Sequence, residues 1–184
     1  MPNKTIQVKV CYGISSKIDR YSHVVMMDYD NISLEDVLLH VIQMQKEYDL
    51  SDFYIIKSTN GYNTICLDML PLSLIYSIGV NVDSPADRDF FKAGLDRQHF
   101  TLRFDLDKTL LGIVTNDSKK YVKSLAHKKF LEWFFDILIR DSNFDDNNKI
   151  DIIQFPSNKD GFHLVNKEVP SYLGGIYDKQ QVSR

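Results

Sequence analysis

Residues 33–50, SLEDVLLHVIQMQKEYDL, carry the clearest structural signal in this chain of 184 residues. Ser33 is a favourable helix N-cap, and Asp36 follows it by three residues. Ile32 and Val37 occupy the two positions of a hydrophobic staple. Apolar residues then recur at helical spacing, at Leu34, Val37, Leu38, Val41, Ile42 and Tyr48. The stretch therefore predicts an amphipathic helix that covers an apolar surface.

Strand-like runs lie on both sides of this helix. Ile6, Val8 and Val10 alternate with polar residues, and HVVMMDY (residues 23–29) follows after a short polar link. We interpret these two runs as a first hairpin. After the helix, DFYIIKS and YNTICL flank the dipeptide Asn60-Gly61, which predicts a second hairpin with a tight turn. HFTLRFDL (residues 99–106) alternates apolar and polar residues and predicts a fifth strand.

The order strand, strand, helix, strand, strand, short turn, strand over residues 4–107 resembles the ubiquitin-like β-grasp fold. NISLEDVLLHVI (residues 31–42) and the following hairpin region resemble Ras-binding domains of the Raf type and the first lobes of FERM domains. The resemblance implies an α+β protein-binding module. The polar segment of residues 81–97 is longer than the corresponding connection of a plain ubiquitin-like unit, so we interpret it as an insertion and a candidate binding element. We therefore predict a β-grasp domain over residues 1–107.

Residues 108–184 predict an extension of that domain. A helix is expected over residues 119–141, capped by Asp117 or Ser118. KIDIIQF and GFHLV (residues 161–165) then predict a C-terminal hairpin, followed by a polar tail. The first half of the helix carries a basic group that we interpret as a solvated face, with an acidic partner as the alternative: Lys119, Lys120, Lys123, Lys128 and Lys129.

Composition narrows the function classes. The net charge of −3 at pH 7 argues against a general nucleic-acid binder, because phosphate binding needs a dense cationic face. No run approaches the roughly 20 apolar residues that span a bilayer, and the N-terminus lacks an apolar signal core. We expect an intracellular protein, cytoplasmic or nuclear. Cys11 and Cys66 have no metal or redox spacing, which indicates two reduced core thiols.

Basic residues gather on the predicted first hairpin. Lys9, Lys17, Arg20 and His23 are the candidate partner-binding residues. In the Ras-binding domains that the chain resembles, the edge strand of this hairpin pairs with a GTPase strand, and basic side chains meet its acidic surface. The leading hypothesis is therefore a non-enzymatic protein-interaction module or adaptor, without a cofactor, for which a small GTPase is one candidate partner.

An enzymatic alternative rests on FDLDKTLLGI, which resembles the first motif of the haloacid-dehalogenase-like phosphatases. That resemblance implies a Mg²⁺-dependent phosphohydrolase with Asp105 as nucleophile and Asp107 as acid and base. Arg103 interrupts the strand that such an enzyme would bury on both faces, and about 80 residues remain for its sheet. We therefore favour the interpretation of Asp105 and Asp107 as the polar side and end of a strand.

Two further alternatives remain open. NFDDNNKIDIIQ (residues 143–154) resembles a degraded EF-hand loop, which implies a weak calcium site with Asn143, Asp145 and Asn147 among its ligands. The chain can also be a structural subunit of a complex, in which aromatic residues of the second helix face an obligate partner: Phe130, Trp133, Phe134 and Ile137. No histidine stands in a recognisable nucleophile motif.

Overall fold

The computed structural model describes residues 9–81, 83–105, 107–140, 143–145, 152–157 and 176–178. Those residues form a mixed α+β fold with four helices, and the elements follow one another in this order: β1 (Lys9–Ser15), β2 (His23–Asp30), α1 (Leu34–Tyr48), β3 (Phe53–Lys57), β4 (Gly61–Leu70), α2 (Leu72–Gly79), α3 (Arg88–Arg97), β5 (Thr101–Phe104), β6 (Thr109–Val114), β7 (Lys123–Ser124), α4 (Leu125–Phe135), β8 (Phe144–Asp145), β9 (Ile152–Ser157) and β10 (Ile176–Asp178).

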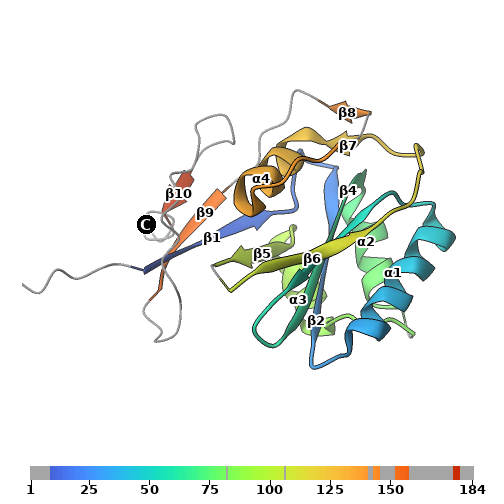
Figure 1. Ribbon diagram of the computed structural model, residues 1–184, viewed down its shortest axis with the longest axis horizontal. Helices are drawn as coiled ribbons and strands as arrows, with labels where there is room; N and C mark the ends of the chain where they lie inside the picture. Colours follow the sequence, from blue (N-terminus) through green and yellow to red (C-terminus); the bar gives the residue numbers. More distant parts are fainter. Residues whose placement is uncertain are drawn as a thin grey trace, which may run out of the picture.

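The larger sheet is built around β4. β4 pairs antiparallel with β3 on one side and with β2 on the other, and β3 also pairs antiparallel with β6. β2 and β3 therefore run in the same direction with β4 between them, and α1 connects the two across one face of the sheet (Figure 1). The short strands β7 and β8 extend the sheet from β4.

The predicted helix is confirmed as α1. The Ser33 hydroxyl accepts a hydrogen bond from the Asp36 N–H at 3.1 Å, which satisfies a backbone donor that the helix leaves unpaired. One detail of the predicted face is wrong. Ile42, expected on the apolar face, is 39% exposed, and the buried side of the helix includes His40, which bonds to the Tyr29 hydroxyl at 2.9 Å. Tyr29 supplies the polar partner that lets His40 lie on the buried side.

The second predicted hairpin is confirmed as β3 and β4. Ser58 N–H donates to the Gly61 carbonyl at 3.0 Å across the turn that contains Asn60. A Cβ atom at Gly61 would lie 1.8 Å from the Tyr29 carbonyl oxygen, so only glycine fits beside β2 at this position. The turn signal in the sequence thus reflects both the hairpin and the close approach of a neighbouring strand.

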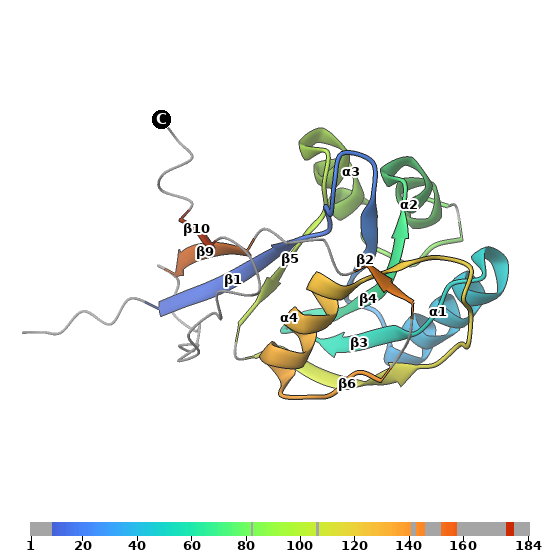
Figure 2. The ribbon, with the colours of Figure 1, turned by 90° about the horizontal axis from the view of Figure 1, so that it is seen from above.

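The first predicted hairpin is wrong. β1 and β2 belong to different sheets, and within the described part of the chain they form no ladder with each other, apart from the isolated bridge Lys17–His23 in the link between them. β1 instead lies between β5 and β9 in a smaller sheet of order β10-β9-β1-β5 (Figure 2). The fifth predicted strand is confirmed as β5, which pairs antiparallel with β1. The structure therefore confirms an α+β fold but does not confirm the β-grasp arrangement.

Residues after 107 contribute to both sheets. β6, which was not predicted as a strand, pairs with β3, and the predicted strand KIDIIQF is found as β9 beside β1. α4 begins at Leu125 with Ser124 as N-cap. The predicted caps are wrong because the Ser118 hydroxyl donates to the Asp49 carbonyl at 2.7 Å, which holds this segment against the end of α1. GFHLV lies outside the described residues.

The aromatic residues of α4 pack into the fold. Phe130 and Phe134 are buried, and both rings contact Phe104 at centroid distances of 5.0 and 5.1 Å. Trp133 is half-buried, with its ring 5.8 Å from that of Tyr12. α4 thus joins its rings to residues of both β1 and β5. No helix in the part of the chain that the structure describes has the length and apolar character to cross a membrane.

Three buried histidines each lie against a polar partner. The His23 ring bonds to the Ser16 hydroxyl at 3.1 Å, and the His127 ring lies between the Ser124 hydroxyl and the Ser15 carbonyl, at 2.7 and 2.8 Å. Burial lowers the pKa of His23, His40 and His127 to about 4 in each case, because it disfavours the charged ring.

We predict that acid destabilises the fold below pH 6.5. Unfolded histidine titrates near pH 6.5, so the unfolded chain binds protons first, and stability falls between pH 6.5 and 4. Asp28, whose pKa is raised to about 6, and Asp68, whose pKa burial also raises, act in the opposite direction, but they are two groups against three. Urea unfolding should show a loss of about 2–4 kcal/mol between pH 7 and pH 4.5. A constant free energy of unfolding over this range would contradict the prediction.

Candidate functional site: a polar pocket between the two sheets

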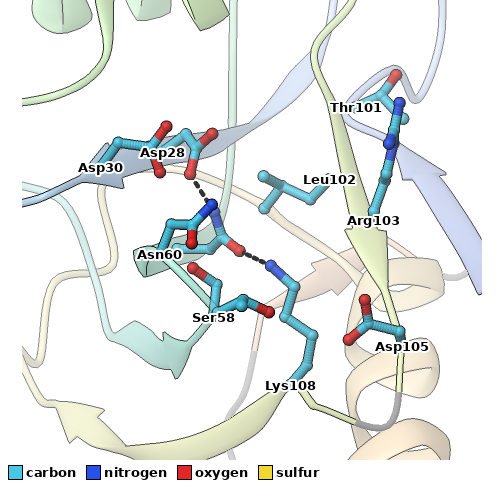
Figure 3. A pocket seen from close by; sticks show the side chains of 11 residues that line it. Asp28, Asp30, Ser58, Asn60, Thr101, Leu102, Arg103, Asp105 and Lys108 are labelled. Carbon is cyan, nitrogen blue, oxygen red and sulfur yellow. Dashed lines mark hydrogen bonds between the residues drawn. The ribbon is translucent and has the colours of Figure 1, made fainter. Parts of the chain in front are cut away.

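A pocket of about 300 Å³ lies between β2 and β4 on one side and β5 on the other (Figure 3). Its lining comes from strands and turns that are far apart in the sequence, and ten of its eleven side chains are polar. The lining residues are Asp28, Asp30, Ser58, Thr59, Asn60, Asn63, Thr101, Leu102, Arg103, Asp105 and Lys108.

Strand pairing places the acidic wall of the pocket. Asp28 lies opposite Asn63, and Asp30 lies opposite Gly61, in the β2–β4 register. Since Asp28 and Asp30 are two residues apart on one strand, their side chains share a face of the sheet. Arg103 and Asp105 lie across the pocket from them, and the Lys108 side chain reaches up between the two walls (Figure 3).

A chain of hydrogen bonds connects the two walls. Lys108 Nζ donates to Asn63 Oδ1, and Asn63 Nδ2 donates to Asp28 Oδ1 at 2.6 Å. The Lys108 N–H also donates to the Asp105 carbonyl at 3.1 Å, which closes the turn between β5 and β6. The lysine is thus held by its backbone at one wall and by its ammonium group at the other.

The pocket perturbs the pKa values of its charged groups. Burial, together with the nearby carboxylates of Asp30 and Asp87, raises the pKa of Asp28 to about 6, against the opposing effect of the Lys108 ammonium group. Burial lowers the pKa of Lys108, and the negative charges of Asp28 and Asp105 oppose this effect. Perturbed ionisable groups that face a cavity are a common mark of a functional site.

Asp28, Asp30 and Asp87 are the described residues that could hold a metal ion. A carboxylate oxygen from each lies within 4.8 Å of the others, and carboxylate oxygen suits Mg²⁺ or Ca²⁺. Asp87 is also the N-cap of α3, and its carboxylate accepts the Asp89 N–H at 3.0 Å. An acidic cluster alone is common without an ion, so we build no metal centre on it.

Asp105 lines this pocket, but the strand before it differs from the strand that the phosphatase motif implies. Asp105 is 6% exposed, and its carboxylate accepts the Asp107 N–H at 3.1 Å. β5 is an antiparallel strand at the end of the smaller sheet, whereas a phosphatase nucleophile follows a central parallel strand. Asp107 is exposed and does not line the pocket.

The candidate partner-binding residues are not brought together as one surface. Lys17 and Arg20 are exposed on the link between β1 and β2. His23 is 2% exposed, so its ring is not available to a partner. Lys9 pairs with Ser157 of β9, and its side chain lies outside the described residues. Because β5 and β9 flank β1, the expected addition of a partner strand to β1 has no open edge.

The weak calcium alternative gains no support. Asn143 uses its side-chain amide to donate to the Tyr121 carbonyl at 3.0 Å. Asp145 belongs to β8, and Asn147 lies outside the described residues. α4 ends at Phe135, so within the described part of the chain no helix leads directly into the loop as it does in an EF-hand.

Sequence reasoning did not single out Asp28, Asp30, Asn63 or Lys108. One signal was present: Asp28 and Asp30 form an i, i+2 pair at the end of an apolar run, which places two carboxylates on one face of a strand. The contribution of Lys108 depends on the pairing of β6 with β3, and β6 was not predicted.

Comparison of the chain with protein-family models, with curated proteins and with solved structures gives no match. The interpretation of the pocket therefore rests on its own residues.

We predict that Lys108→Met raises the pKa of Asp28 above 6. The substitution removes the cation that stabilises the Asp28 carboxylate and leaves Asn63 without its donor. It should also cost about 1–3 kcal/mol of stability. The measurement is an NMR titration of the Asp28 carboxyl carbon, combined with urea unfolding. Lys92→Met, at an exposed position on α3, is the matched control. An Asp28 pKa that does not change in Lys108→Met would refute the coupling.

Proposed function

We propose that this chain is a non-enzymatic binding protein whose polar pocket takes a small hydrophilic ligand with a positively charged group. The observation that carries the proposal is a cavity of about 300 Å³ with an acidic excess in its lining. Three carboxylates face two cations there, and one of those cations, Lys108, is already engaged by Asn63. A ligand ammonium group would offset this excess of negative charge.

The size and polarity of the pocket indicate the kind of ligand. About 300 Å³ is at the lower end of the range for small-molecule sites. Such sites are usually lined by apolar side chains, whereas here Leu102 is the one apolar residue among eleven. The hydroxyl and amide groups of Ser58, Thr59 and Asn60 add hydrogen-bonding partners beside the acidic wall. This lining favours a ligand that carries hydroxyl or amino groups over its whole length.

The test uses a panel of hydrophilic amines: putrescine, spermidine, arginine and glucosamine. Isothermal titration calorimetry and two-dimensional NMR should detect at least one of them with a Kd of about 10 µM to 1 mM. Asp28→Asn keeps an oxygen that can accept the Asn63 hydrogen bond but removes the charge, and it should weaken binding at least about five-fold. Succinate and glucose serve as anionic and neutral controls.

Asp96→Asn is the control variant, because it removes an exposed carboxylate of α3 that does not line the pocket. It should bind like the wild type. If no amine of the panel shifts the resonances of the lining residues, or if Asp28→Asn binds as tightly as the wild type, the proposal is wrong.

A second candidate function is docking of a protein partner at the link between β1 and β2. The Arg20 guanidinium lies 5.4 Å from the centre of the Tyr21 ring, and both side chains are exposed beside Lys17. Arginine and tyrosine are enriched at the energetic centres of protein interfaces. The resemblance of residues 31–42 and of the following hairpin region to Ras-binding domains supports an acidic partner, for which a small GTPase is the candidate.

We predict that the double change Lys17→Glu and Arg20→Glu abolishes capture of such a partner. Affinity capture at low and moderate salt, read by mass spectrometry, should give a partner whose recovery falls with salt, because exposed charges are screened. Lys92→Glu with Arg97→Glu changes the net charge equally on α3 and should capture the partner normally. Equal capture by both double variants would eliminate this docking surface.

A further inference from the structure

Among the residues that the structure describes, β6 is the last strand at one edge of the larger sheet. It pairs with β3 on one side, and no strand among the described residues pairs with its other side. Leu111 and Ile113 are 47% and 43% exposed along it. A strand edge of this kind presents backbone N–H and C=O groups that can pair with a further strand.

The opposite edge of the sheet is covered. The Asp28 carbonyl of β2 accepts the Asp87 N–H at 2.7 Å, and the Val24 N–H donates to the Ser16 carbonyl at 2.9 Å. The residues of β2 from His23 to Met27 are buried. Residues of the β1–β2 link and the segment before α3 therefore use the backbone groups that β2 would otherwise expose. Among the described residues, β6 is covered in this way only at its end, where the Gln45 side-chain amide of α1 donates to the Val114 carbonyl at 2.8 Å.

The composition of β6 is unusual for an exposed edge. Residues 109–115, TLLGIVT, contain no charged residue and no proline, which are the usual means of preventing edge-to-edge pairing. A register shift opposite Ile55 and Ile56 makes one local irregularity. Gly112 stands in the middle of the strand, and a Cβ atom there would meet nothing within 4 Å. A glycine within a strand often marks a place where another backbone approaches closely.

We propose that β6 pairs antiparallel with β6 of a second copy of the chain. Antiparallel pairing of a strand with itself follows from two-fold symmetry, and it requires that the strand does not repel its own copy. An uncharged strand meets that condition. In a register centred on Gly112, Leu111 of one copy lies opposite Ile113 of the other, so exposed aliphatic side chains cover each other on both sides of the axis. The two larger sheets then form one continuous sheet.

The expected dimer is weak. Pairing of residues 110–114 along one edge buries less surface than the roughly 1,200 Å² of a stable interface. We therefore expect a reversible dimer with a Kd of about 10–500 µM. Lys108, directly before β6, lines the polar pocket, but no residue of β6 itself does, so the dimer contact and the ligand proposed above use different residues.

The test is sedimentation velocity of the full chain over an about hundred-fold concentration range around that Kd. The wild type should change from monomer to dimer as concentration rises. Ile113→Lys places a charge on the edge and should remain a monomer. Leu95→Lys is the matched control, because Leu95 is a similarly exposed aliphatic residue, 38% exposed, on α3, and it should dimerise like the wild type.

Amide hydrogen exchange gives a second measurement that does not depend on a variant. Amides of β6 that face away from β3 should exchange more slowly at high protein concentration, whereas amides of α3 should not change. A wild type that stays monomeric at every concentration would overturn the proposal. A dimer that persists unchanged in Ile113→Lys, or one that leaves exchange in β6 unaffected, would also overturn it.

Discussion

The backbone of β4 has to be hydrogen-bonded along both of its edges. This requirement places β2 and β3 on either side of β4 and sends α1 across the sheet between them. Eight of its ten residues are buried, and an unpaired backbone in that position would be costly. β3 takes one edge through the tight turn at Asn60-Gly61. The other edge is left for β2, which lies before α1 in the chain. α1 therefore has to cross the sheet to connect β2 with β3, and its apolar side covers that face.

The buried amide of Asn63, on the opposite face of the sheet, explains part of the polarity of the pocket. Asn63 is buried on β4, and a buried amide needs partners for both its oxygen and its nitrogen. Lys108 and Asp28 supply them. The hydrogen-bonding requirement of the Asn63 amide accounts for the presence of Lys108 and Asp28 in the pocket. It does not account for Asp30, Arg103 and the hydroxyl groups that surround the same cavity, and these are the residues that a ligand would contact.

The parts of the fold that the sequence predicts well depend on neighbouring residues. Ser33 and Asp36 specify the start of α1, and Asn60-Gly61 specifies the turn between β3 and β4, because the interactions in both cases lie within a few residues of each other. The predicted start of α4 was wrong for the opposite reason. Ser118 is a suitable cap by type, but its hydroxyl bonds to Asp49, which is 69 residues away. Ser124 caps the helix instead.

β1 and β6 show the limit of local reasoning. The link between β1 and β2 is short enough for a hairpin, yet β2 forms eight residue pairs with β4, and that register buries its apolar residues. β1 instead completes its hydrogen bonds with β5 and β9, which lie far along the chain, and pairing over such a separation has no local sequence signal. β6 was missed because TLLGIV lacks the alternation of a half-buried strand. Leu111 and Ile113 are exposed, so β6 carries apolar side chains on both of its faces. A strand that is covered on both faces has this pattern, whereas a strand with one face in water alternates apolar and polar residues.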